Sequence, residues 1–165
     1  MAYSQVRDII DHVKAFHRKL QHAFEQLADE TDDERARLLL ELLEDYEDEL
    51  KRVLARYASE EHSGVVETWI QYDPIDELRA ALAESELAPG MPLERLVEQT
   101  LRLNQAIIEF YRQAADQVAA PRAQELFEAL LTLEQSKNAR YAQTALELVD
   151  GGELSSGEPP RSQGD

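Results

Sequence analysis

The 165-residue chain contains no cysteine. Disulfide bridges, thiolate metal sites and cysteine nucleophiles are therefore excluded. Glycine and proline are also scarce, at six residues each, and the many alanine, leucine and glutamate residues favour helix over sheet. No stretch reaches the roughly 20 apolar residues of a transmembrane helix. The charges within the first 16 residues do not fit a signal peptide.

The chain has few positively charged residues. The chain has 17 lysine and arginine residues against 34 aspartate and glutamate residues, which gives a formal net charge of −17. Nucleic acids and anionic membrane surfaces repel such a chain, so we expect neither as a partner. The sequence predicts a soluble, cytoplasmic protein.

Four long segments show the apolar periodicity of amphipathic helices. They run from about residue 3 to 28, from Asp32 or Asp33 to about 57, from about 90 to 118, and from Pro121 to about 148. The connections within the first pair and within the second pair are short, so each pair is predicted to form an antiparallel hairpin.

A longer segment separates the two pairs. Residues 61–89 are more than a turn needs, and Asp73-Pro74 marks the start of a short helix that ends at about Glu84. We predict that this crossover spans the length of one domain over residues 1–149, with hairpins over about 3–60 and 90–149. The Gly-, Ser- and Pro-rich residues 150–165 are predicted to be a disordered tail.

The two hairpins match each other when the sequence is shifted by 87 positions. The sequence FEQLAD (residues 24–29) then falls on YRQAAD (residues 111–116), Arg35 on Arg122, and Glu47 on Glu134. The register holds through a helix, a turn and a second helix. This predicts two related hairpins packed about a pseudo-twofold axis.

Two repeated helical hairpins joined by a long crossover resemble the ferritin-like superfamily, particularly its rubrerythrin-like members. The resemblance implies an all-α, antiparallel four-helix bundle. In that family each half supplies one carboxylate from its first helix and a Glu-x-x-His pair from its second, and these residues bind two iron ions. Carboxylates suit this role because they bridge the metals and neutralise their charge.

The resemblance assigns residues of this chain to those ligand positions. His17 and Asn104 stand where the first-helix carboxylates belong, and Glu47 and Glu134 stand at the second-helix glutamates. Each pair is related by the same shift of 87 positions. Two of the four expected carboxylates are therefore present.

Neither expected histidine is present. Leu50 and Lys137 stand three residues after Glu47 and Glu134. A leucine cannot bind a metal, and a lysine places a positive charge where a cation would lie. The sequence LEQSK (residues 133–137) thus looks like the remains of a metal-binding helix. We expect Lys137 to lie between two buried glutamates, which would otherwise repel each other.

Three functional hypotheses follow. The first is a metal-degenerate bundle without a cofactor that acts as a scaffold or binding protein and forms a homodimer. The second is an iron- or manganese-dependent oxidoreductase or iron-handling protein that uses Glu47, Glu134 and His17, helped by Asn104 or by Glu109 after rotation of its helix. The third is an acidic helical adaptor whose similarity to ferritin-like proteins is convergent.

Two further features concern packing. The only tryptophan, Trp69, lies in the crossover, where we expect it to close one side of the bundle; a contact between protomers is the alternative. The acidic sequence EDYEDE (residues 44–49) lies within a helix, so its carboxylates fan around the axis and do not converge on a cation, and Tyr46 is expected to point inward.

Overall fold

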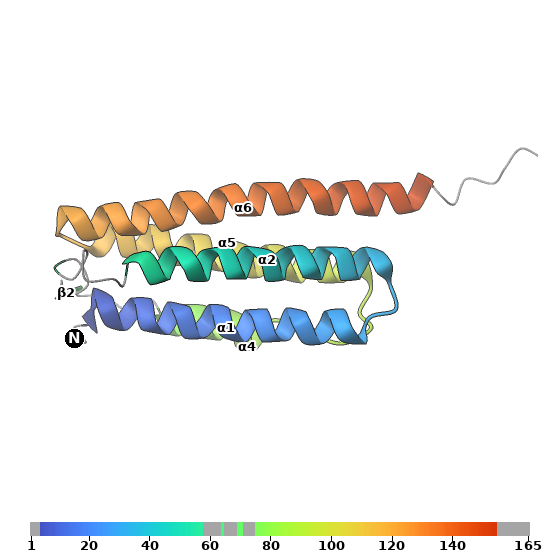
Figure 1. The fold of residues 1–165 in the computed structure, drawn as a ribbon, viewed down its shortest axis with the longest axis horizontal. Coiled ribbons are helices and arrows are strands. Elements are labelled where there is room, and N and C mark those ends of the chain that lie inside the picture. The colour runs from blue at the N-terminus through green and yellow to red at the C-terminus, as the bar shows by residue number, and fades with distance from the viewer. Residues whose placement is uncertain (1–3, 58–63, 65–68, 71–74, 155–165) are drawn as a thin grey trace, which may run out of the picture.

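The computed structural model describes residues 4–57, 64, 69–70 and 75–154 (Figure 1). In chain order the elements are β1 (Ser4–Gln5), α1 (Val6–Glu30), α2 (Glu34–Tyr57), β2 (Trp69–Ile70), α4 (Ile75–Glu84), α5 (Leu93–Gln117) and α6 (Pro121–Leu154). The all-α prediction is confirmed, since the only strands in the described part of the chain are the two-residue β1 and β2, which pair antiparallel.

The four long helices lie side by side. Three residues join α1 to α2 and three join α5 to α6, so each pair is an antiparallel hairpin. In Figure 1, α1 and α6 run in one direction while α2 and α5 run in the other. The short helix α4 packs against both α1 and α5, and it confirms the helix predicted in the crossover. The path from α2 to α5 therefore leads from one end of the molecule to the other.

Local sequence signals explain where the helices begin. The Asp33 carboxylate accepts a hydrogen bond from the backbone N–H of Arg35 (2.9 Å) at the start of α2, which is a typical N-terminal cap. Pro121 is the first residue of α6, where its missing N–H costs nothing. Gly90 precedes α5 with a φ of 74°, a conformation that favours glycine.

Apolar side chains from α1, α2, α4, α5 and α6 form a single core. The predicted inward stripe of α1 is buried in full: Val6, Ile9, Ile10, Val13, Phe16, Leu20, Phe24 and Leu27. Burying one such side chain contributes roughly 1.5–3 kcal/mol. This packing fixes the rotation of each helix about its axis, and with it the direction of the polar residues that interrupt the stripes.

The bounds of the helices follow the shift of 87 positions. Moved by that number, Val6 and Glu30 at the ends of α1 fall on Leu93 and Gln117 at the ends of α5, and Glu34 falls on Pro121. The fourth helix departs from the pattern, because α6 has 34 residues and α2 has 24.

Two expectations need correction. The helix α6 continues to Leu154, so residues 150–154, which we assigned to the tail, are helical. The helical hydrogen bonds continue there despite the low propensity of Gly151 and Gly152. Residues 155–165 lie outside the described residues. Trp69 does not close the bundle, because it is 61% exposed; the pairing of its backbone with Gln5 leaves its side chain in solvent.

None of the helices in the described part of the chain combines the length and the apolar character that a membrane crossing requires.

Candidate functional site

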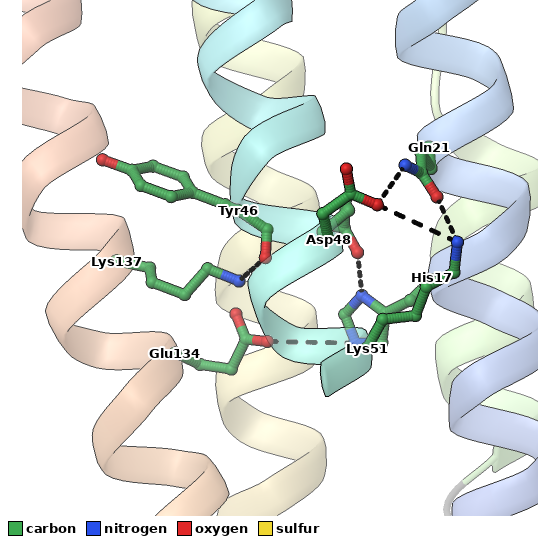
Figure 2. A network of polar contacts seen from close by, with 8 residues as sticks. His17, Gln21, Tyr46, Asp48, Lys51, Glu134 and Lys137 are labelled. Atoms are coloured by element: carbon green, nitrogen blue, oxygen red, sulfur yellow. Dashed lines mark hydrogen bonds and ion pairs between the residues drawn. The ribbon is translucent and has the colours of Figure 1, made fainter. Parts of the chain in front are cut away.

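Four ionisable side chains are buried together at mid-length of the long helices. Figure 2 shows His17 on α1 and Glu134 and Lys137 on α6. The fourth residue, Glu47, belongs to α2. The exposed fractions of His17, Glu47, Glu134 and Lys137 are 2%, 7%, 5% and 4%. Each occupies an inward position of its helix, so the helical periodicity that forms the core also directs these groups into it. We call these four residues the buried ion cluster.

The imidazole of His17 lies between the two carboxylates. Its Nδ1 is 2.5 Å from Oε2 of Glu47, and its Nε2 is 3.8 Å from Oε1 of Glu134. Burial lowers the pKa of His17, but the charge and hydrogen bond of Glu47, together with the charge of Glu134, outweigh that effect and raise it. The two carboxylates therefore favour the protonated form of His17, and the imidazole ring connects α1 to both α2 and α6.

The carboxylate of Glu134 is less fully paired than that of Glu47. Burial raises the pKa of Glu134, and the positive charges of His17 and Lys137 oppose this rise only in part. Among the described residues, neither Oε1 of Glu134 nor Nε2 of His17 has a hydrogen-bond partner. The distance between these two atoms is too long for a direct hydrogen bond.

Lys137 takes a position that differs from our expectation. We expected it to lie between the two glutamates, but its ammonium group donates a hydrogen bond to the backbone carbonyl of Tyr46 (2.7 Å) and lies 5.5 Å from the centre of the Tyr46 ring. The ammonium still acts on Glu134 through its charge. His17 is thus the bridging cation, and Lys137 ties α6 to the backbone of α2.

The other residues assigned by the resemblance lie as follows. Leu50 is fully buried in the apolar core. The amide of Asn104 donates to the side chain of Asn138 (3.0 Å). Glu109 is half-exposed and binds Arg112 (2.6 Å). The structure therefore brings His17, Glu47 and Glu134 together and gives Asn104 and Glu109 other partners.

Tyr111 is a member of this polar region that the sequence did not single out. Its side chain is fully buried, and its hydroxyl has no hydrogen-bond partner among the described residues. Burial, together with the charges of Glu134 and Glu47, raises the pKa of Tyr111 well above its usual value. The shift of 87 positions pairs Tyr111 with Phe24. The only sequence signal for a polar group at this place was therefore a tyrosine at the position that matches a phenylalanine.

A hydrogen-bonded chain at the surface covers the α1–α2 side of the cluster. The amide of Gln21 donates to Asp48 (2.7 Å), and Lys51 donates to the carbonyl oxygen of Gln21 (2.8 Å) (Figure 2). Gln21 lies one turn beyond His17 on α1, and Asp48 follows Glu47 on α2. These contacts hold the two helices at the distance that the His17–Glu47 hydrogen bond requires.

The cluster does not fit a di-iron centre. Two iron ions need about six inward ligands, whereas only His17, Glu47 and Glu134 carry ligand atoms in the cluster. In the described part of the chain, no group of three or more histidine, aspartate or glutamate residues is arranged to hold a metal ion. The positive charges of His17 and Lys137 also oppose a cation at this place.

Comparison of the chain with protein-family models, with curated proteins and with solved structures finds no match. A functional assignment therefore rests on the buried ion cluster and on the surface of the protein.

Proposed function

We propose that this protein is a ferritin-like four-helix bundle that has lost di-iron catalysis and acts in the cytoplasm as a scaffold or binding protein. In this proposal the buried ion cluster replaces a metal centre and stabilises the fold. It has no catalytic residue and needs no cofactor.

The observation that carries the proposal is the charge balance of the cluster. The carboxylates of Glu47 and Glu134 bring two negative charges into the core, and the imidazolium of His17 and the ammonium of Lys137 bring two positive charges. In a di-iron protein, metal ions supply that positive charge. Here protein side chains supply it, and His17 takes the bridging place with a contact of 2.5 Å to Glu47. A buried charge is stable only when it is paired in this way.

The arrangement of the helices supports the ferritin-like part of the proposal. The two hairpins run in opposite senses, a crossover along the molecule connects them, and the bounds of α1 and α5 differ by 87 positions at both ends. Duplication of one ancestral hairpin accounts for all three features. It also accounts for Glu47 and Glu134, which are related by the same shift and which both enter the cluster.

Elemental analysis tests the absence of a metal function. The purified protein is measured before and after anaerobic incubation with ferrous iron and with manganese, followed by desalting. We expect no stoichiometric metal in either sample. A useful comparison is the double variant His17→Glu, Lys137→His, which restores one carboxylate and one histidine. It should retain more metal than the unsubstituted protein, provided that circular dichroism shows it to be folded.

One observation favours the alternative, an iron- or manganese-dependent oxidoreductase or iron-handling protein. The atoms His17 Nε2 and Glu134 Oε1 lack hydrogen-bond partners within the described residues and lie 3.8 Å apart. In addition, the contact of His17 with Glu47 is one that metal-binding histidines commonly make through their other ring nitrogen. The same measurement separates the hypotheses, because this alternative requires bound metal after desalting.

A further inference from the structure

One face of α6 carries almost no charge although it faces solvent. Between Glu128 and Glu147, eight residues of α6 are exposed, and Arg140 is the only charged one among them. The other seven are Ala129, Thr132, Gln135, Ser136, Ala139, Gln143 and Leu146. We call these seven residues the neutral face of α6. They span 18 positions of helix, or about 27 Å at 1.5 Å per residue.

The rest of the molecule makes this face unusual. The chain has a net charge of −17, and eight of the eleven exposed residues of α1 are charged. Exposed helix surfaces in soluble proteins normally carry interspersed charges, because charge keeps them in solution. Depletion of charged residues is, in contrast, a feature of the buried centres of protein interfaces.

The single charge in this stretch does not interrupt the face. The guanidinium group of Arg140 lies 5.6 Å from the centre of the Tyr46 ring, so it is directed toward α2. The positions 129, 132, 136, 139, 143 and 146 then follow the alternating spacing of three and four residues that forms the contact line of paired helices. At the end of this line, the side chain of Leu146 is 62% exposed.

We propose that the neutral face of α6 binds the same face of a second copy of this chain, with the two α6 helices antiparallel about a twofold axis. A single continuous face pairs with itself in this way, as in most homodimers. Alanine, serine and threonine at the centre of the face allow close approach of the helix axes, near the short end of the usual 8–10 Å range.

Charge favours a second copy over a basic protein as the partner. A basic protein would be attracted to the carboxylates of α1 and α2 and would gain nothing from a neutral surface. A partner with the same strong negative charge is repelled by the acidic surfaces. It can approach closely only where carboxylates are missing, and the neutral face of α6 provides such a place on both copies.

This inference deepens the binding role proposed above, since it names the partner and the surface. It does not depend on the metal content of the buried ion cluster. Metal content and oligomeric state are separate measurements, so the failure of one proposal is distinguishable from the failure of the other.

Sedimentation equilibrium of the full chain tests the dimer with a matched pair of variants. Ala139→Glu places a carboxylate at the centre of the neutral face, near its symmetry copy. Ala15→Glu makes the same change at an exposed position of α1. We expect Ala139→Glu to weaken the dimer by about tenfold or more, because like charges meet at the interface, and Ala15→Glu to leave the dissociation constant within about twofold of that of the unsubstituted protein.

Salt and cross-linking provide two independent checks. The dimer should tighten as salt rises from about 50 mM to about 500 mM, because screening reduces the repulsion between the two negatively charged chains. The chain has no cysteine, so Ser136→Cys introduces one thiol, which should form a covalent dimer on mild oxidation, whereas Ala15→Cys should not. A monomeric unsubstituted protein, or a dimer that Ala139→Glu and Ala15→Glu affect equally, overturns the proposal.

Discussion

Replacement of His17 by leucine should destabilise the protein strongly, because it removes the bridging residue of the buried ion cluster. The change removes the 2.5 Å hydrogen bond to Glu47 and the positive charge 3.8 Å from Glu134. It leaves two buried carboxylates that share only the ammonium of Lys137 as a counter-charge. The side chain of leucine fills most of the space, so the effect is electrostatic and not that of a cavity.

The expected magnitude follows from two contributions. A hydrogen bond to a charged group contributes about 1.5–3 kcal/mol. Two opposite charges 3.8 Å apart attract each other by about 4 kcal/mol at an effective dielectric constant of about 20. The desolvation of the imidazolium, which the leucine variant avoids, offsets part of this gain. The free energy of unfolding should therefore fall by about 3–5 kcal/mol below about pH 6.5, the usual cost of removing one partner of a buried ion pair.

The loss should depend on pH in a defined direction. The pKa of His17 is raised above 6.5 in the folded state, so its stabilising contribution is complete below about pH 6.5 and is lost as the pH rises through the folded-state pKa. The pKa of Glu134 is raised as well, and in acid the protonated carboxyl no longer needs a counter-charge. The difference between the two proteins should be largest below about pH 6.5 and above the range in which Glu134 takes up its proton, and it should shrink on both sides of that window.

Urea unfolding followed by circular dichroism measures this difference. His22→Leu is the matched control, because His22 lies on the same helix with 72% of its side chain exposed, and its replacement should change the free energy of unfolding by no more than about 0.5 kcal/mol. If His17→Leu costs no more than His22→Leu at about pH 6, the bridging role of His17 is refuted.

Three further predictions concern single side chains. Lys137→Ala should lower the free energy of unfolding by about 3–5 kcal/mol near neutrality and by less in acid, where Glu134 takes up a proton; an unchanged urea midpoint at neutral pH would argue against a buried ammonium. Tyr111→Phe should leave stability unchanged or raise it by up to about 1 kcal/mol, because the hydroxyl it removes has no partner among the described residues; a loss above about 2 kcal/mol would reveal a hydrogen bond. Fluorescence of Trp69, the only tryptophan, should be quenched readily by iodide or acrylamide, since its side chain is 61% exposed, whereas emission protected from both quenchers would mean that Trp69 is buried.

Apolar periodicity predicted most of the fold. The stripe from Val6 to Leu27 is buried as expected, and the hairpins and the short helix α4 follow from loop lengths and from Asp73-Pro74. The end of α6 was not predictable in the same way. Gly151 and Gly152 are poor helix formers, and propensity alone places the end of the helix before them, whereas the helix continues to Leu154.

The residues of the buried ion cluster were easier to predict than the contacts that their side chains make. The spacing of three and four residues shows that His17, Glu134 and Lys137 face inward, but it does not fix the side-chain rotamers. Lys137 has a long side chain that reaches past Glu134 to a backbone carbonyl on α2. Every residue has a backbone carbonyl group, so the sequence pattern could not indicate which carbonyl accepts the hydrogen bond from Lys137. A histidine at a carboxylate position opposite two glutamates was the available sign of a bridge.

The prediction that the side chain of Trp69 is buried was wrong for a related reason. A large aromatic residue in a crossover favours burial, but its surroundings are set by strand pairing with Gln5. Two-residue strands carry no periodicity from which such a pairing could be predicted.

The most direct test of the account is the metal content of the purified protein after anaerobic exposure to ferrous iron and desalting. If His17 and Lys137 supply the positive charge of the core, the protein should retain no stoichiometric iron, and its urea midpoint should be the same before and after exposure. Retention of about two iron ions per chain, with a rise in the midpoint, would contradict the account and would identify the buried ion cluster as a metal centre.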